Sequence, residues 1–305
     1  MYLIFSLFAA LSLYLGLHME NAAAAIFLGI IFTFIMKPEK SFFSRQIGTI
    51  PLQIGIVIVG ATISLSDAWS TSAKYLPWIS LFVLASFFMG LLLGKILGIH
   101  QRIAFLLSAG AAICGGTAMA AVAPIIKAKP QELLVAMTIV FFLNALAIFF
   151  FPIVGNYLEM SNFEFGAWSA LAIHDTSSVV GSAQTFGNES VQVAATLKLG
   201  RTIWLIPLII ITNWIFNRQT DTAKFPRFIL FFILAIIANF FLKFDETILI
   251  VLQILSQSFL LFGLFCIGTQ FNIIELKSIS GKPLILALIL WFMVIPSAYW
   301  LVTNF

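Results

Sequence analysis

Three stretches of this sequence place polar or ionisable residues inside segments that are otherwise apolar. Residues 114–117 interrupt one segment with two glycines, and residues 174–178 interrupt another with five consecutive polar side chains. Lys198 and Arg201 lie in a third apolar segment, three positions apart. A charge near the middle of a bilayer costs at least a few kcal/mol unless it is paired or hydrated, so these residues are candidates for binding and transport chemistry.

The first interruption weakens a helix at a small, flexible site. Gly115 and Gly116 favour non-helical backbone, Thr117 can cap a second half-helix, and Pro124 removes a further hydrogen bond. We therefore predict that the segment 102–126 is discontinuous. The alternative is a single kinked helix that packs closely through its small residues. The candidate binding residues at this break are Cys114, Gly115, Gly116 and Thr117.

The second interruption puts polar residues where a plain membrane helix would be apolar. Such backbone is tolerated at membrane depth only when it is buried in protein or lines a wet cavity. Asp175 or Thr176 could cap the half-helix that follows, and the segment 164–186 would then be broken as well. The alternative is an aqueous loop between two short segments, since each flank is only about half a span long. The candidate residues at this break are His174, Asp175, Thr176, Ser177 and Ser178.

Two half-helices that begin inside the membrane would present their N-termini there, which favours an anion. Lys198 and Arg201 share one helix face and add positive charge. One interpretation is that they attract an anionic substrate, and the other is that one of them forms a structural salt bridge with Asp175. The imidazole of His174 would either carry a coupling proton or stay neutral and hydrogen-bonded in the interior.

The elements that carry these residues are membrane helices. The chain has 305 residues, of which 61% are apolar and 9% charged, with a mean hydropathy of +1.09. A soluble domain is about 45–50% apolar and about 25% charged, so the composition excludes an ordinary soluble enzyme, a disordered protein and a nucleic-acid binder. About twenty apolar residues span a bilayer, so we interpret residues 1–305 as a single transmembrane unit with no soluble domain.

Recurring apolar stretches predict an all-α polytopic membrane protein with about 9 to 11 transmembrane helices, two of the segments being discontinuous. The first stretch lacks the basic flank of a signal peptide and is expected to remain as a span. Two isolated cysteines and three distant histidines predict no metal site, and no cofactor is expected. The expected spans are residues 2–17, 21–36, 47–65, 75–98, 102–126, 132–152, 164–186, 190–216, 226–243, 247–271 and 282–302.

Basic residues cluster in loops that share one side of the membrane if the N-terminus is cytoplasmic, and we expect a multi-pass protein of the inner membrane. Lys127 and Lys129 would fall outside, and Glu159 and Glu164 inside, if both discontinuous segments cross the bilayer. Re-entrant segments would remove this conflict, and the sequence leaves both arrangements open. The basic residues on the expected cytoplasmic side are Lys37, Lys40, Arg45, Lys95, Arg102, Arg218, Lys224, Arg227, Lys277 and Lys282.

A short internal repeat links two distant parts of the chain. Residues 55–65 resemble residues 263–273 at an offset of 208 positions. With the expected spans, the two stretches run in opposite directions across the membrane. This is the pattern of inverted-topology repeats in secondary transporters, so we predict inverted repeats.

Four motifs of this chain occur together in one known family: Ala-Ile-Cys-Gly-Gly-Thr-Ala-Met-Ala-Ala-Val-Ala-Pro at 112–124, Ile-His-Asp at 173–175, Val-Val-Gly at 179–181 and Leu-Lys-Leu-Gly-Arg at 197–201. Through these motifs the chain resembles the bacterial sulfate exporter family, conserved inner-membrane proteins of mostly unproven function. The family usually has Ala-Ser where this chain has Gly116-Thr117, a departure that keeps small and hydroxyl side chains. The family in turn is similar to bile-acid symporters and cation/proton antiporters, which implies core and panel subdomains, interleaved in sequence, that move relative to each other. The second break follows the first by only one span, however, and two equal tandem repeats would not produce that order.

We therefore expect a secondary active transporter of a small anion that works by alternating access, with sulfate or a sulfonate as the substrate the resemblance implies. The residues of the two breaks, with Lys198 and Arg201, would bind substrate, and His174 and Asp175 would carry the coupling proton. The alternative is a Na⁺- or H⁺-coupled transporter of an organic or neutral solute with Asp175 as the cation site. An enzyme is not expected, since no HExxH, GxSxG or phosphate-loop motif occurs. The expected partners are the lipid bilayer and the anion, with no nucleic acid, and a homodimer is an open option.

Overall fold

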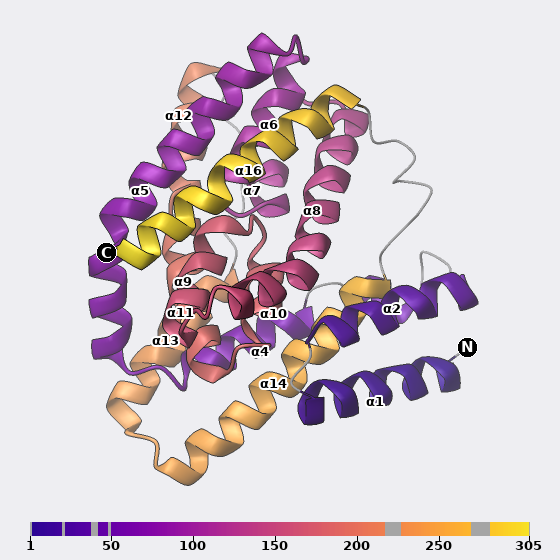
Figure 1. The fold of residues 1–305 in the computed structure, drawn as a ribbon, viewed down its shortest axis with the longest axis vertical. Coiled ribbons are helices and arrows are strands. Elements are labelled where there is room, and N and C mark those ends of the chain that lie inside the picture. Colours follow the sequence, from indigo (N-terminus) through magenta and orange to yellow (C-terminus); the bar gives the residue numbers. More distant parts are fainter. Residues whose placement is uncertain are drawn as a thin grey trace.

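The chain folds as a bundle of α-helices (Figure 1). The computed structural model describes residues 2–19, 22–37, 42–47, 50–216, 227–269 and 281–304. These described residues contain helices and no strands, and five of the helices are long and apolar enough to span a membrane. The expected class, an all-α polytopic membrane protein, is therefore confirmed.

Helix boundaries follow most of the expected spans to within a few residues. The expected span 47–65 ends at Gly60, and the next helix begins at Leu65 rather than at 75. Hydropathy marks where a helix enters the apolar layer, and the polar residues 66–74 are already helical before that point. The helices are α1 (Tyr2–Met19), α2 (Ala22–Met36), α3 (Phe43–Ile47), α4 (Ile50–Gly60), α5 (Leu65–Ile96), α6 (Gln101–Ala112), α7 (Gly116–Val122), α8 (Pro130–Tyr157), α9 (Asn162–Ala172), α10 (Thr176–Ala183), α11 (Asn188–Thr202), α12 (Leu205–Ile215), α13 (Arg227–Leu242), α14 (Glu246–Thr269) and α16 (Gly281–Asn304).

The helices fall into two groups by packing (Figure 1). α1, α2, α3, α4, α13 and α14 pack on one another and form what we call the panel group. α5 to α12 and α16 pack on one another and form the core group. α10 makes the most extensive contact between the groups, against α2, α4 and α14. In Figure 1, the panel helices α1, α2 and α14 lie in the lower part of the view, below α6, α8 and α16 of the core group.

Two helices of the panel group meet through a reciprocal contact that follows the sequence repeat. A Cβ at Gly55 would lie 2.8 Å from the Leu260 side chain, and one at Gly263 would lie 2.5 Å from that of Leu52. The two leucines, like the two glycines, are 208 positions apart in the sequence. Because Leu52 meets Gly263 while Gly55 meets Leu260, α4 and α14 run antiparallel where they cross. Glycine lets the two backbones approach closely at this crossing.

The second discontinuous segment is re-entrant. A Cβ at Gly187, after α10, would lie 3.7 Å from the side-chain amide nitrogen of Asn162, the first residue of α9. The rings of Phe165 and Phe186 stack with their centroids 3.6 Å apart. A straight broken helix would separate these rings by about 30 Å. The chain therefore turns back at the break, and we call α9 and α10 hairpin 2.

The first discontinuous segment is re-entrant too. Glu132, in the first turn of α8, lies 3.2 Å from Nδ1 of His100 and 3.8 Å from the guanidinium of Arg102, at the start of α6. Near the tip, a Cβ at Gly110 of α6 would lie 3.2 Å from the side chain of Met119 in α7. The chain thus enters and leaves at the same end of the core group, and we call α6 and α7 hairpin 1.

Re-entrance of both segments settles the question that the sequence left open and removes its conflict of charges. Lys127 and Lys129 lie between hairpin 1 and α8, on the side of Arg102. Glu159 and Glu164 lie at the opposite end of α8, where hairpin 2 begins. The two hairpins therefore enter the core group from opposite ends.

The hairpins and the helices that follow them form a second inverted repeat. α6 ends at Ala112 and α9 ends at Ala172, 60 positions later. Hairpin 1 is followed by α8, of 28 residues, and hairpin 2 by the stretch Asn188–Ile215, also of 28 residues, which contains α11 and α12. The first half of the chain reads α2, α4, α5, hairpin 1 and α8, and the second reads hairpin 2, α11 with α12, α13, α14 and α16. In the first half the hairpin and the long helix after it come last, whereas in the second half they come first. This exchange of order explains why only one span, α8, separates the two breaks.

Candidate functional site

The tips of the two hairpins touch. Gly115 precedes α7 with a φ of 59°, a left-handed conformation that favours glycine. A Cβ at this position would lie 3.3 Å from Cβ and 3.4 Å from Cα of Asp175, at the tip of hairpin 2. Gly115 is therefore required both for its backbone conformation and for the close approach. The structure brings the two breaks singled out in the sequence side by side.

Arg201 binds the ends of both half-helices that run into the breaks. Its fully buried guanidinium donates to the carbonyl oxygens of Ala111 and Ala112 at the end of α6, and to those of Ala170 and Leu171 at the end of α9. Helix C-termini leave carbonyl groups unpaired and carry partial negative charge, which a cation stabilises. A planar guanidinium with five N–H donors suits this bridging role.

Lys198 lies one helical turn before Arg201 and is also fully buried. Its ammonium donates to the carbonyl oxygen of Ile173, 2.8 Å away, at the end of α9. The ion pairs within the described residues both involve Glu132, so neither cation forms the anticipated salt bridge with Asp175 there. Carbonyl groups at the broken helix ends hold the two cations instead.

Asp175 is the N-cap of α10, as the sequence allowed. Its carboxylate accepts hydrogen bonds from the backbone N–H of Ser178 at 3.2 Å and from the Ser178 hydroxyl at 3.3 Å. A carboxylate at a helix N-terminus is stabilised by the unpaired N–H groups and by the helix dipole. Asp175 is half-buried, whereas Thr176, Ser177 and Ser178 are buried.

His174 completes the tip of hairpin 2, with 1% of its surface exposed. Neither ring nitrogen has a hydrogen-bond partner among the described residues. A neutral imidazole has one donor and one acceptor, and burying either without a partner costs about 1–3 kcal/mol. Lys198 and Arg201 bind carbonyl oxygens of the residues just before it, Lys198 that of Ile173 and Arg201 those of Ala170 and Leu171. An unpaired imidazole in this place calls for a further ligand, such as water or the oxygen of an anion.

The residues of hairpin 1 divide between the tip and its surroundings. Cys114 is buried, and a Cβ at Gly116 would lie 2.9 Å from the ring of Phe141 in α8. Thr117 is exposed and does not cap α7, because the N-cap position is occupied by Gly115. The turn at Gly115 leaves Thr117 inside the first turn of the helix, where its side chain points outward.

Three further buried polar groups of hairpin 2 were not among the predicted site residues. Ser169, Ser182 and Gln184 are buried, and each has a side-chain oxygen without a partner among the described residues. Single serines are common packing residues in helices rich in small side chains, so Ser169 and Ser182 carried no signal. Gln184 did carry one, since an uncharged amide in an apolar segment needs a partner.

The ionisable groups at the hairpin tips carry more positive than negative charge. The C-termini of α6 and α9 and the N-termini of α7 and α10 meet there, so their partial charges offset one another. Two buried cations, Lys198 and Arg201, then face one carboxylate, that of Asp175. The site keeps a net positive charge when all three groups are ionised.

Comparison with known proteins assigns the chain to a family. Residues 1–287 match the family model described as Conserved hypothetical protein 698. The chain belongs to this family. It is 37% identical to a UPF0324 membrane protein of Bacteroides thetaiotaomicron, over 88% of this chain and 82% of that one. It is 36% identical to a UPF0324 membrane protein of Photobacterium profundum, over 94% of this chain and 88% of that one.

The relatives share the membrane character of the chain. A further UPF0324 membrane protein, from Geobacter sulfurreducens, is 32% identical over 90% of this chain and 88% of its own length. Together with the long apolar helices, these matches support a multi-pass membrane protein. No solved structure matches the chain.

Proposed function

We propose that this chain is a secondary active transporter that binds a small anion between the tips of hairpin 1 and hairpin 2. The observation that carries the proposal is His174, a buried imidazole with both nitrogens unpaired among the described residues, beside the buried cations Lys198 and Arg201. An anion would accept a hydrogen bond from the imidazole and be attracted by both cations. The proposal involves no catalytic step, and one chain supplies every residue of the site.

Close packing of hairpin 2 on the panel group supports alternating access. The segment from Thr176 to Gln184 is buried, and α10 packs against α2, α4 and α14. A Cβ at Gly181 would lie 2.7 Å from the side chain of Leu264 in α14. Two side-chain hydrogen bonds join α11 to its neighbours at the end of the molecule where hairpin 2 begins. Gln192 of α11 donates to the hydroxyl of Thr62, in the link between α4 and α5, at 3.0 Å. Gln257 of α14 donates to the side-chain oxygen of Asn188 in α11 at 2.7 Å.

Hairpin 1 is packed differently. α7 lies against α6, α8 and α12, and one face is exposed along Thr117, Ala120 and Pro124. A transporter whose inverted repeats pack unequally is in one of two states. It reaches the other state when each repeat adopts the conformation of the other. In the second state hairpin 1 would pack on the panel group. Hairpin 2 would then expose the residues that lie 60 positions after Thr117, Ala120 and Pro124. Those positions are Ser177, Val180 and Gln184.

The chemistry of the site guides the choice of substrate and coupling ion. A compact oxyanion fits an imidazole donor flanked by fixed cations, and the resemblance to sulfate exporters favours sulfate or a sulfonate. His174 is the residue of the site that can take up and release a proton near neutral pH when the site hydrates. We infer that it carries the coupling proton and that Asp175 orients hairpin 2.

Electrophysiology on solid-supported membranes, with purified and reconstituted protein, tests the proposal. Sulfate, sulfite, a small sulfonate and chloride are each applied as concentration jumps, with and without a pH gradient. We expect a saturable current for one of the anions, with an apparent affinity about tenfold weaker in His174→Leu and in Lys198→Gln, as the loss of one charge-assisted hydrogen bond predicts. His100→Leu is the matched control, because His100 lies at the surface beside Glu132. A protein that gives no current with any anion contradicts the proposal.

A second candidate is a Na⁺- or H⁺-coupled transporter of an organic or neutral solute. The half-buried Asp175 favours it, since a carboxylate with the hydroxyls of Ser177 and Ser178 nearby offers the oxygen ligands that hard cations prefer. Asp175→Asn should retain the cap on α10, because asparagine caps helices as well as aspartate does. A current on a Na⁺ or pH jump that this variant abolishes, without any anion response, would select the second candidate.

A further inference from the structure

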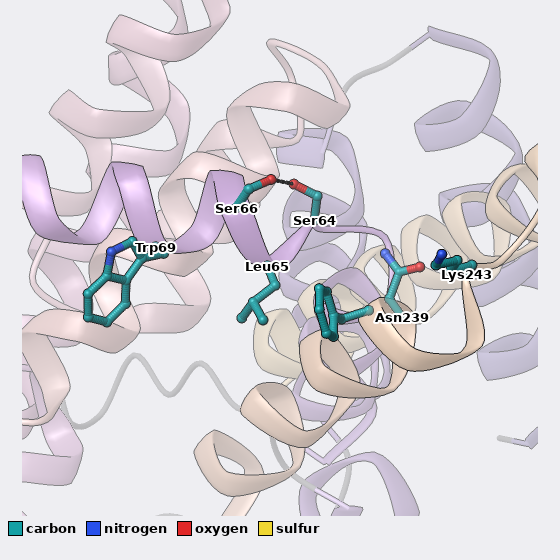
Figure 2. Close-up of a pocket in the computed structure, with 7 residues that line it drawn as sticks. Ser64, Leu65, Ser66, Trp69, Asn239 and Lys243 are labelled. Carbon is teal, nitrogen blue, oxygen red and sulfur yellow. Dashed lines mark hydrogen bonds between the residues drawn. The ribbon is translucent and has the colours of Figure 1, made fainter.

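A cavity of about 510 Å³ opens where the link between α4 and α5 meets the end of α13 (Figure 2). Its walls come from both groups of helices, since α5 belongs to the core group and α13 to the panel group. It lies far from Lys95 at the other end of α5, and therefore away from the side where basic residues cluster. The cavity is lined by Ser64, Leu65, Ser66, Trp69, Asn239, Phe240 and Lys243.

Two hydrogen bonds involve the polar residues that line the cavity. The hydroxyls of Ser64 and Ser66 lie 2.9 Å apart. The Asn239 side chain donates to the carbonyl oxygen of Ile63 at 3.1 Å and so joins the end of α13 to the link. Figure 2 shows Trp69 and Lys243 at opposite ends of the cavity, with the two serines and Leu65 between them.

Lys243 is the cation among the residues that line the cavity. The described cations at this end of the molecule are Lys74 and Lys243, in keeping with the scarcity of basic residues on one side of a membrane protein. The ammonium of Lys74 lies 5.5 Å from the centroid of the Tyr75 ring, a cation–π contact. The side chain of Lys243 is exposed and has no ion pair with a described residue.

Large apolar side chains flank these polar groups. Trp69 is 75% exposed and Phe240 is 54% exposed, at the ends of helices that run through the apolar layer. Tryptophan is enriched at the level of lipid headgroups, where its ring contacts acyl chains and its N–H faces water. The lining of the cavity therefore combines a cation and hydroxyl groups with exposed aromatic rings that can contact hydrocarbon.

We propose that this cavity binds the phosphodiester headgroup of a glycerophospholipid from the adjacent leaflet. The ammonium of Lys243 and one hydroxyl of the hydrogen-bonded pair Ser64–Ser66 would donate to the phosphate oxygens, and the acyl chains would lie along Trp69 and Phe240. A free phosphate would contact only the polar residues of the cavity, and the exposed rings of Trp69 and Phe240 would then have no role in binding. Because the walls come from α5 and α13, a bound lipid would join the core group to the panel group. The proposal is independent of what the hairpin tips bind.

Quenching of Trp69 fluorescence by a brominated lipid tests the proposal on the purified, full-length protein. Brominated phosphatidylglycerol is titrated into mixed micelles of a neutral detergent, and the Trp69 signal is the difference between the wild-type protein and Trp69→Phe. We expect saturable quenching, with a half-saturating mole fraction about threefold to tenfold higher in Lys243→Gln. The matched control is Lys95→Gln, which removes a cation at the other end of α5 and should leave the titration unchanged.

Two further arms separate the possible outcomes. Ser64→Ala combined with Ser66→Ala removes donors without removing charge and should weaken the lipid about twofold to fivefold, which also provides a test should Lys243→Gln fail to fold. Glycerol 3-phosphate carries the phosphate without acyl chains and should not reverse the quenching at millimolar concentration. Quenching that rises linearly with lipid and is the same in all variants overturns the proposal, and so does full reversal by glycerol 3-phosphate.

Discussion

The contacts of Arg201 change what a charge-removing substitution at this position can report. Its guanidinium binds four carbonyl groups from the ends of α6 and α9, so the residue holds the two hairpins together in addition to contributing charge. Loss of transport in a variant of Arg201 would therefore not distinguish a lost ligand from a lost fold. Lys198, with one carbonyl contact, and His174, with none among the described residues, are the better positions for testing anion binding.

Arg201→Met should destabilise the protein by about 3–5 kcal/mol, because buried carbonyl groups lose a charged partner and no water replaces it. Arg201→Lys should rescue little of this loss, since a single ammonium cannot reach both helix ends as a planar guanidinium does. Thermal unfolding of the purified protein in detergent measures the effect, with Arg102→Met at the surface as the control. Equal stability of Arg201→Met and wild type would show that the carbonyl contacts contribute little.

Gly115→Ala should destabilise the hairpin tips by about 1–3 kcal/mol. The substitution places a Cβ on a residue with φ of 59° and brings it to 3.3 Å from Asp175. Gly200→Ala is the matched control, because Gly200 lies within α11 with nothing within 4 Å of an added Cβ. Alanine there should stabilise the helix by about 0.5–1 kcal/mol. The order of the two melting temperatures checks the prediction, and Gly115→Ala unfolding at or above Gly200→Ala would contradict it.

At the scale of residues, the sequence revealed the positions of the site but not their partners. Gly115 and His174 stand out because glycine pairs and polar runs are unusual in apolar segments, and the structure places both at the hairpin tips. The partners of Arg201 are backbone carbonyls, which are present at every position and leave no mark on side-chain composition. A salt bridge with Asp175 was the only pairing that side chains could suggest.

At the scale of elements, the sequence located both discontinuous segments but not their direction. Apolar length and a break in the middle are the same for a helix that crosses the membrane and for a hairpin that returns. The information lies in contacts such as the stacking of Phe165 on Phe186, which join positions 21 residues apart and follow no local periodicity. Hairpins would remove the conflict of charge signs in the flanking loops, but these few charges left both arrangements open, and the structure has hairpins.

The unequal packing of the hairpins predicts unequal reactivity. Thr117→Cys on α7 should react with a water-soluble maleimide at least about tenfold faster than Ser177→Cys on α10, because Thr117 is exposed and Ser177 is 8% exposed. The native Cys114 and Cys266 are buried and should add little background. The rates are measured on purified protein in detergent by the mass shift over time. Equal rates would mean that the two hairpins are exposed alike and would remove the support for alternating access.

At the scale of the whole molecule, two sequence offsets describe one architecture. An offset of 208 relates α4 to α14 in the panel group, and an offset of 60 relates hairpin 1 to hairpin 2 in the core group. The first offset was visible as a short glycine-containing repeat, whereas the second was hidden because one break is made of glycines and the other of polar residues. Exchanged order in the second half means that no single offset aligns both groups, so a tandem repeat was not recognisable along the chain.

This architecture fixes which loops share a side of the membrane, and labelling in intact cells can check it. With both segments re-entrant, Lys129→Cys lies on the side of Arg102→Cys, and Glu159→Cys lies on the opposite side, at the far end of α8. If hairpin 1 instead crossed the bilayer, Lys129 would change sides relative to Arg102. A membrane-impermeant maleimide applied to whole cells, with and without permeabilisation, distinguishes these cases. We expect Glu159→Cys to react in intact cells and the other two variants only after permeabilisation, because the cation-rich side of a membrane protein faces the cytoplasm. Reaction of Arg102→Cys and Lys129→Cys from different sides would overturn the hairpin arrangement on which the anion site depends.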